Sequence, residues 1–251
     1  MTDFSYQLYS SRNFPPLPET LKMLGEFGYR QVEGYGGLFA DPDAIEELKG
    51  HLAANGLTMP TGHIGLDMVR DQPERVLEIA KALGMEAIFL PAIGPGERNK
   101  DTAGWRAFGE QLAAVAEPYR KAGLIFGWHN HAFEFVETET GEMPLDLILA
   151  GDPKLALELD VAWTVKGGQD PLAWIEAYSD RIVAAHVKDI APEGQCVDED
   201  GWADVGQGVM DWPAIMAALR KTKARWFVME HDNPNDHVRF ARRSIEAARI
   251  L

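Results

Sequence analysis

Cysteine is almost absent from this sequence. Its 251 residues include only one, Cys196, so an internal disulfide is excluded. A chain of this length buries enough surface to fold without cross-links, and the lack of disulfides favours a reducing compartment. No stretch approaches the roughly 20 apolar residues of a membrane span, and the first residues lack the basic start and apolar run of a signal peptide. We therefore expect a cytoplasmic protein without a membrane partner.

Positive charge is also scarce. The chain has 24 Lys and Arg residues against 39 Asp and Glu, which gives a formal net charge of -15. Such an acidic chain repels phosphate backbones, so we expect no nucleic-acid partner. A glycine-rich phosphate loop is missing after the first expected strand, which disfavours an open nucleotide-binding sheet. These absences leave a small molecule as the favoured ligand, and the number of subunits stays open, with a homo-oligomer as one alternative.

What the sequence does contain is a regular alternation of β-rich and helical segments. Eight runs of strand character, such as 87–91, are each followed by a helical stretch, and Gly84 and Gly123 lie where two helices should end. Eight βα units with apolar strands predict parallel strands closed into a barrel. We expect a (β/α)8 TIM barrel, formed by residues 1–251 as a single domain. One long acidic segment, 191–209, has no expected strand or helix.

Charged and imidazole side chains gather at the ends of the expected strands. In such a barrel the active site lies at the C-terminal ends of the strands. Converging carboxylates repel one another unless a cation lies among them, so the pattern predicts one bound divalent metal ion. Carboxylates with imidazole favour Mn²⁺, with Mg²⁺, Co²⁺ and Zn²⁺ as alternatives. The strand-end residues are Glu33, His63, His129, His131, Glu134, Glu158, Asp160, His186, Lys188, Asp189, Glu230, His231 and Asp232.

Strand periodicity narrows the set of ligands. Alternate residues of a strand point to the same face, so Glu158 and Asp160 share a face, as do His186 and Lys188. Asp160, His186 and Glu230 then lie at the rim of the barrel. Glu158 lies one layer deeper, where it either contacts the substrate or orients a metal ligand.

Four runs resemble the sugar phosphate isomerase/epimerase superfamily, the xylose isomerase-like TIM barrels, and the first is typical of a subgroup with the pattern HNHxFEF. The resemblance implies one divalent metal with four ligands from strands five to eight, and Asp160, His186 and Glu230 match three of them. For the fifth strand it implies Glu134 reaching back to the metal, although ketose epimerases of the family have a Glu where this chain has His129. The runs are WHNHAFEF (128–135), ELDVAW (158–163), HVKD (186–189) and MEHD (229–232).

The remaining strand-end residues are candidates for proton transfer and substrate binding. Glu230 and His129 are the leading acid–base candidates, with Lys188 or His63 assisting. A pKa drop would make Lys188 an acid–base group, whereas pairing with Asp189 or Glu158 would make it structural. His63 has a buried structural role as its alternative. Candidate substrate contacts are Glu33, His131, Trp163 and Glu158.

The leading functional hypothesis is an isomerase or epimerase that acts on a ketose or an oxidised sugar through a metal-bound enediolate. A lyase that eliminates from a keto-inositol or a 3-keto sugar is the alternative enzyme. A sugar-binding barrel without metal is the non-enzyme alternative, because fold alone does not establish activity. The segment 191–209, with glycines at 194, 201, 206 and 208, is expected to act as a mobile lid over the barrel mouth.

Overall fold

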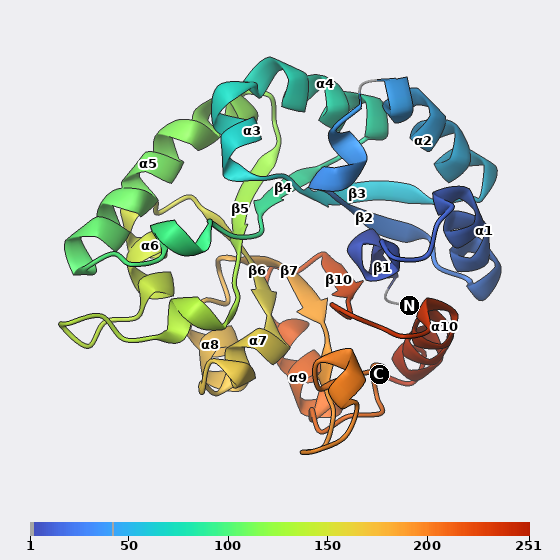
Figure 1. Cartoon of the computed structure of the whole chain (residues 1–251). Coiled ribbons are helices and arrows are strands. Elements are labelled where there is room, and N and C mark those ends of the chain that lie inside the picture. The colour runs from blue at the N-terminus through green and yellow to red at the C-terminus, as the bar shows by residue number, and fades with distance from the viewer. Residues whose placement is uncertain (1–2, 42) are drawn as a thin grey trace.

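The computed structural model describes residues 3–41 and 43–251. Its central feature is a closed barrel of eight parallel strands, and Figure 1 shows the helices arranged around it. This confirms the expected TIM-barrel fold. Around the barrel the strands follow the order β1, β10, β7, β6, β5, β4, β3, β2. They are β1 (Phe4–Gln7), β2 (Gln31–Tyr35), β3 (Thr58–His63), β4 (Ala87–Leu90), β5 (Ile125–His129), β6 (Ala156–Asp160), β7 (Ile182–Val187) and β10 (Trp226–Met229).

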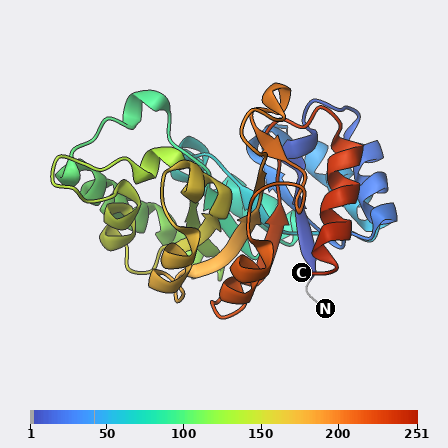
Figure 2. The ribbon, with the colours of Figure 1, turned by 90° about the horizontal axis from the view of Figure 1, so that it is seen from below.

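The helices form the outer layer, as the second view also shows (Figure 2). Each expected helix is present, and α3 and α7 are short additional ones in βα connections. The α-helices are α1 (Leu17–Phe27), α2 (Asp43–Ala54), α3 (Leu66–Asp71), α4 (Pro73–Leu83), α5 (Thr102–Lys121), α6 (Pro144–Gly151), α7 (Val161–Lys166), α8 (Pro171–Ala177), α9 (Trp212–Leu219) and α10 (His237–Ala248). The 3-10 helices are η1 (Leu8–Ser11), η2 (Gly36–Phe39), η3 (Pro95–Glu97), η4 (Ala132–Phe135) and η5 (Val197–Glu199).

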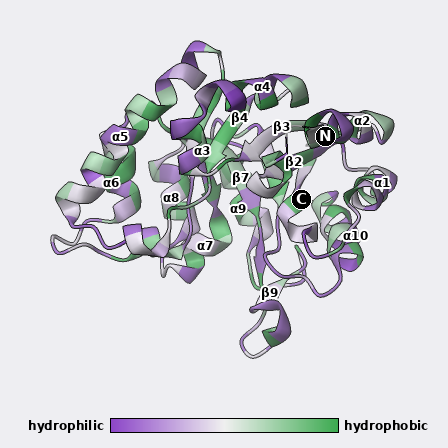
Figure 3. Ribbon diagram, turned by 45° about the horizontal axis from the view of Figure 1, so that its top comes forward, coloured by the Kyte–Doolittle hydropathy of each residue, from purple (hydrophilic) through white to green (hydrophobic). Residues whose placement is uncertain are grey.

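Local sequence explains where these elements begin and what they bury. Aspartates cap several helices; the Asp101 side chain, for example, accepts a hydrogen bond from the Gly104 amide at the start of α5. The apolar strands make the inner layer, and Figure 3 shows β4 as hydrophobic while the outer helices carry hydrophilic residues. The parallel sheet is therefore covered on its outer face by helices.

Helices α5 and α6 pack closely against each other. A Cβ atom placed on Gly109 of α5 would lie 2.3 Å from the carbonyl oxygen of Ile148, so only glycine permits this approach. The backbones of the two helices consequently touch. This contact fixes the outer wall beside β5 and β6, the two strands that carry His129 and Asp160.

The segment 191–209 was expected to contain no strand or helix, but the structure shows a short strand and a 3-10 helix in it. It follows β8 (Asp189–Ile190), which pairs in antiparallel fashion with β9 (Trp202–Ala203) inside the segment, and η5 lies between them. Salt bridges from Arg239 to Glu199 and Asp204 fasten it to α10. Within the described residues, no helix is both long and apolar enough to cross a membrane.

Candidate functional site

The strand register brings the predicted site residues side by side. His129 at the end of β5 is paired with Glu158 of β6, and Asp160 at the end of β6 is paired with His186 of β7. Glu230 follows β10, the neighbour of β7. The buried side chains therefore converge at the C-terminal ends of four adjacent strands, where TIM barrels have their active sites.

Two overlapping groups within this cluster have the composition of a metal site. In one group His129, Asp160, His186 and Glu230 each offer a ligand atom, and these atoms lie within 4.8 Å of one another. In the other group His63 and Glu158 take the places of Asp160 and Glu230. All six side chains are buried. Hydrogen bonds to the two shared histidines distinguish the groups.

Each shared histidine has one ring nitrogen held by a deeper carboxylate, and the second nitrogen of His186, Nδ1, lies 2.9 Å from Glu230 Oε2 inside the first group. His129 Nδ1 lies 3.1 Å from Glu158 Oε2, and His186 Nε2 lies 2.8 Å from Glu33 Oε1. Gln7 Nε2 in turn donates to Glu33 Oε1 at 2.8 Å. A carboxylate on one imidazole nitrogen fixes the ring and leaves the other nitrogen for a metal. This pattern makes Glu33 and Glu158 orienting groups and favours the set of His129, Asp160, His186 and Glu230 as ligands.

Asp160 has one oxygen fixed by a hydrogen bond, whereas the other is only 3.8 Å from Lys188 Nζ. Its Oδ1 accepts from the Trp163 amide at the start of α7, whereas its buried Oδ2 has no hydrogen-bond partner among the described residues. Asn130 fixes the backbone of Asp160 through hydrogen bonds to both its N–H and its carbonyl oxygen. The sequence interpretation missed this role of Asn130, although its place between the two histidines of the HNH run was a signal.

The buried charges perturb one another strongly. Burial alone would lower the pKa of His186, but the carboxylates of Glu158 and Glu230 outweigh burial and raise it well above its ordinary value. Burial raises the pKa of Asp160 to about 6. Burial would also raise the pKa values of Glu158 and Glu230, but neighbouring cations outweigh burial and lower both pKa values well below the ordinary range. The carboxylates and the imidazolium groups of the cluster thus stabilise one another's charged forms.

Lys188 is fully buried and paired. Its Nζ lies 2.6 Å from Asp232 Oδ2 and 3.2 Å from Glu230 Oε2, and the ring of Trp202 lies 4.3 Å away. Burial would lower its pKa, but these carboxylates outweigh burial and raise it. The shift is opposite to the pKa drop considered from the sequence, and its partner is Asp232, not Asp189 or Glu158.

Glu134 lies apart from the cluster. Its Oε1 accepts from Trp128 Nε1 at 3.0 Å, and its Oε2 accepts from the His131 amide at 2.9 Å. It belongs to neither candidate metal group. Burial raises the pKa of Glu134 to about 8. The structure therefore does not bring Glu134 to the position that the family resemblance implied, and the β5 residue in the candidate group with Asp160, His186 and Glu230 is His129.

A cavity of about 470 Å³ opens above the cluster. Four predicted site residues line it, namely His63, His129, His131 and Glu230. Glu33, Glu158, Trp163 and Lys188 do not line it. Trp163 instead packs edge-on against Trp202, with ring centroids 4.8 Å apart. Asp232, named among the strand-end residues without a role, also lines the cavity. Sequence interpretation missed the remaining lining residues, which are Tyr9, Tyr35, Gly36, Gly65, Pro91 and Ala92.

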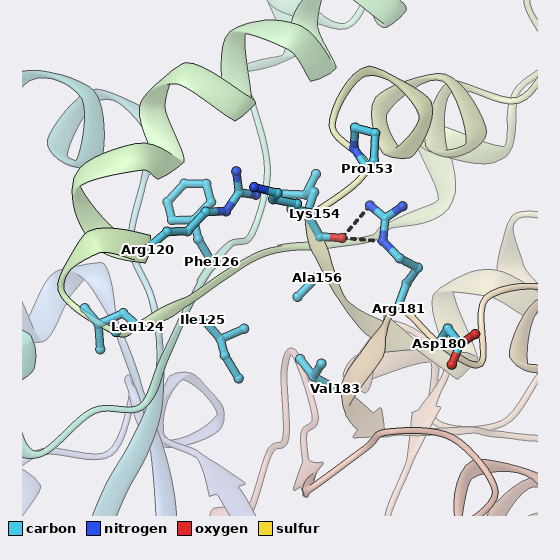
Figure 4. A pocket seen from close by; sticks show the side chains of 12 residues that line it. Arg120, Leu124, Ile125, Phe126, Pro153, Lys154, Ala156, Asp180, Arg181 and Val183 are labelled. Carbon is cyan, nitrogen blue, oxygen red and sulfur yellow. Dashed lines mark hydrogen bonds between the residues drawn. The ribbon is translucent and has the colours of Figure 1, made fainter.

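A second hollow of about 460 Å³ lies at the opposite end of the barrel, near the start of β5, β6 and β7 (Figure 4). Its two arginines are already engaged. Arg181 donates to the carbonyl oxygen of Leu155, and Arg120 forms a salt bridge with Asp152. These contacts hold the connection between α6 and β6. The hollow contains no group comparable to the metal-type cluster and has a structural explanation.

Fold and site together define a TIM barrel with a polar centre at the C-terminal ends of its strands. The family model described as xylose isomerase-like TIM barrel matches residues 21–250, so the chain belongs to that family. This confirms the resemblance noted from the sequence at the level of the superfamily.

Comparison with individual proteins gives more distant similarities. The chain is 25% identical over 164 residues to inosose dehydratase from Lacticaseibacillus casei, a match that covers 57% of this chain and 54% of that protein. The chain thus spans about half the length of the curated relatives it matches. A sugar phosphate isomerase/epimerase structure from Parabacteroides distasonis aligns with a TM-score of 0.80 and 23% identity over 98% of this chain and 93% of that one. A 3-keto-D-glucoside 4-epimerase from E. coli aligns with a TM-score of 0.74 and 18% identity over the full length of both chains.

Proposed function

We propose that this protein is a divalent-metal-dependent enzyme that acts on a small keto sugar or keto-polyol. The observation that supports it is the buried group of His129, Asp160, His186 and Glu230 at the ends of adjacent strands. These residues fit a metal ion because Asp160 Oδ2 is buried without a hydrogen-bond partner and because two carboxylates and two imidazoles are a suitable donor set. Mn²⁺ suits this mixture best, with Mg²⁺, Co²⁺ and Zn²⁺ as alternatives.

When bound, the metal would supply Lewis acidity to a substrate carbonyl and so favour loss of a proton from the adjacent carbon. The chain supplies the groups that move this proton. His131 lines the cavity, and burial lowers its pKa well below the ordinary value, so its ring is neutral and could take a proton from the substrate. His63 also lines the cavity and is held by Glu158 at 2.5 Å. Lys188 does not line the cavity, but it places a fixed positive charge 3.2 Å from the carboxylate of Glu230.

Elimination is the outcome that the site favours. An epimerase of the two-glutamate type needs a carboxylate on each side of the substrate, but β5 ends in His129 and Glu134 is turned toward Trp128. Elimination needs one base and one acid: the C–H proton goes to the base, the β C–O bond breaks, and the leaving hydroxide is protonated to water. The similarity to inosose dehydratase supports the same outcome.

Isomerisation or epimerisation, the leading hypothesis from sequence, is the second candidate. It begins with the same proton abstraction and differs in that the proton returns to another face or carbon. The structural similarity to a 3-keto-D-glucoside 4-epimerase shows that the two proteins share the barrel fold, and it does not extend to the reaction. A sugar-binding barrel without chemistry is the remaining alternative.

The test is incubation of metal-stripped and Mn²⁺-reloaded protein with inososes, ketoses and 3-keto glycosides in deuterated buffer, followed by NMR. The expected result is elimination of water from one substrate, in the reloaded protein only. Deuterium uptake without elimination would instead identify an isomerase or epimerase. Failure of every substrate to exchange or eliminate, with metal bound, would contradict an enzymatic role. Asp160→Ala is the control, because it should bind no metal and give no turnover.

A further inference from the structure

We infer that the substrate of this site carries no phosphate group. The inference rests on the proposed function and narrows its substrate class. TIM barrels that bind phosphorylated substrates frequently hold the phosphate with backbone amides in the loops that follow the last two barrel strands. Here the corresponding loop begins at Asp189, directly after β7 and Lys188, and continues to the start of α9.

The amides of this loop converge on an anion, but the anion is the protein's own Asp189. The N–H groups of Gly206 and Gly208 donate to Asp189 Oδ2 at 2.9 and 3.2 Å, and Trp212 Nε1 donates to the same oxygen at 3.0 Å. The amides of Ile190 and Met210 donate to Oδ1 at 2.9 and 3.2 Å. Five donors thus surround one fully buried carboxylate. Amide groups arranged in this way normally form a site for an external anion.

The space around the carboxylate is also filled. A Cβ atom on Gly208 would lie 2.1 Å from Asp189 Oδ1 and 2.2 Å from the carbonyl oxygen of Ile190, so only glycine fits. Gly206 has a positive φ of 80°, which directs its amide toward the same oxygen atoms. The loop therefore encloses Asp189 and leaves its amides with no room for a phosphate.

No Lys or Arg side chain takes over phosphate binding from these amides at the mouth of the cavity. Of the residues that line the cavity, all of them in the described part of the chain, none is Lys or Arg, while two are the acids Glu230 and Asp232. The basic side chains nearby have other partners within the protein. Arg12 donates to the carbonyl oxygens of Tyr9 and Asp232, Lys166 to that of Asp200, Arg98 to that of Ile93, and Lys188 pairs with Asp232.

The open wall of the cavity suits a neutral ring instead. Tyr9 is partly exposed and meets Tyr35 edge-on, with ring centroids 5.5 Å apart, and both line the cavity with Pro91 and Ala92. Aromatic faces pack well against the C–H groups of an uncharged sugar or cyclic polyol. A dianionic phosphate would instead face Glu230 and Asp232, because the nearest ammonium, Lys188, is already paired with both carboxylates and Arg12 is bonded to the carbonyl oxygens of Tyr9 and Asp232.

The amides provide a direct test that does not depend on turnover or metal. Protein labelled with ¹⁵N-glycine is titrated with inorganic phosphate, and the Gly206 and Gly208 signals are followed by NMR. In the wild type these signals should not shift, whereas in Asp189→Ser they should shift because the amides are released to bind phosphate. Asp189→Asn, which keeps an acceptor oxygen, is the matched control and should behave like the wild type. A phosphate-dependent shift in the wild type, or none in a folded Asp189→Ser, would overturn the inference.

A kinetic comparison separates this inference from the proposed function. The Mn²⁺-loaded enzyme is given fructose and fructose 6-phosphate, tagatose and tagatose 6-phosphate, and xylulose and xylulose 5-phosphate. The neutral member of any pair that reacts should be favoured about tenfold or more in kcat/KM. Preference for a phosphorylated member would refute the inference while supporting the enzyme. If no pair reacts, the glycine-amide titration still decides about phosphate, and the failure falls on the proposed reaction.

Discussion

Replacement of Glu33 tests whether a deep carboxylate orients the metal ligand His186. Glu33 is fully buried and its Oε1 lies 2.8 Å from both His186 Nε2 and Gln7 Nε2. Loss of such an outer partner typically weakens metal binding by about 10- to 100-fold, which corresponds to about 1.4–2.7 kcal/mol. Glu33→Gln, which keeps an acceptor, should fall near the lower figure. Glu33→Leu, which removes the acceptor, should fall near the upper one.

The assay is titration of chelator-stripped protein with Mn²⁺, with free ion measured by EPR and folding checked by circular dichroism. Glu110→Gln, on the exposed face of α5, is the matched control and should bind Mn²⁺ like the wild type. A folded Glu33→Leu variant with an Mn²⁺ affinity within about twofold of the wild type would refute the orienting role. Failure of the wild type itself to bind Mn²⁺ would instead refute the proposed metal site.

Three further results are expected. His129→Gln should lose stoichiometric Mn²⁺ in the same titration while Glu134→Gln keeps it, and the reverse would restore Glu134 as the β5 ligand. Burial raises the pKa of Glu134 to about 8, so the native state holds a proton that the unfolded state releases near 4.5. The melting temperature of the wild type, measured relative to that of Glu134→Gln, should therefore fall as the pH rises from 4.5 to 8. A difference in melting temperature that stays constant over this range would contradict this pKa. Gly109→Ala, whose Cβ would meet Ile148 O at 2.3 Å, should lower the free energy of unfolding by about 1–3 kcal/mol in urea titrations. Gly50→Ala, in open space on α2, should raise it by up to about 1 kcal/mol. Equal effects of the two substitutions would contradict the packing argument.

Most of the fold was readable from the sequence because each barrel strand is an apolar run bounded by turn residues. The run 87–91, for example, contains β4, whose four residues are all buried. The short helices α3 and α7 were missed because six residues are too few to display a helical period. The β8–β9 pair was missed because two-residue strands have no sequence pattern of their own.

The site was readable to the extent that strand ends converge in any such barrel. Register alone places His129 beside Glu158 and Asp160 beside His186. The direction of the Glu134 side chain could not be predicted from the sequence. It depends on a hydrogen bond from Trp128, and no sequence rule fixes the orientation of the Trp128 ring within its strand. The orienting role of Glu158 was one of two alternatives that strand periodicity left open, whereas Glu33 was expected only as a substrate contact, because its sequence position does not show how deep it lies in the barrel.

Asp189 illustrates how a motif residue at a strand end can act through a loop. The HVKD run suggested a candidate near the metal, but the Asp189 carboxylate faces the loop amides, away from His186. Those five hydrogen bonds, with the salt bridges of Glu199 and Asp204 to Arg239, hold the segment 191–209 against the barrel without a substrate. Trp202 of this segment lies against Lys188, so the loop already covers one side of the site. These contacts favour a fixed wall, whereas the mobile lid expected from the sequence stays a prediction that hydrogen exchange on 191–209, with and without a bound substrate analogue, would test.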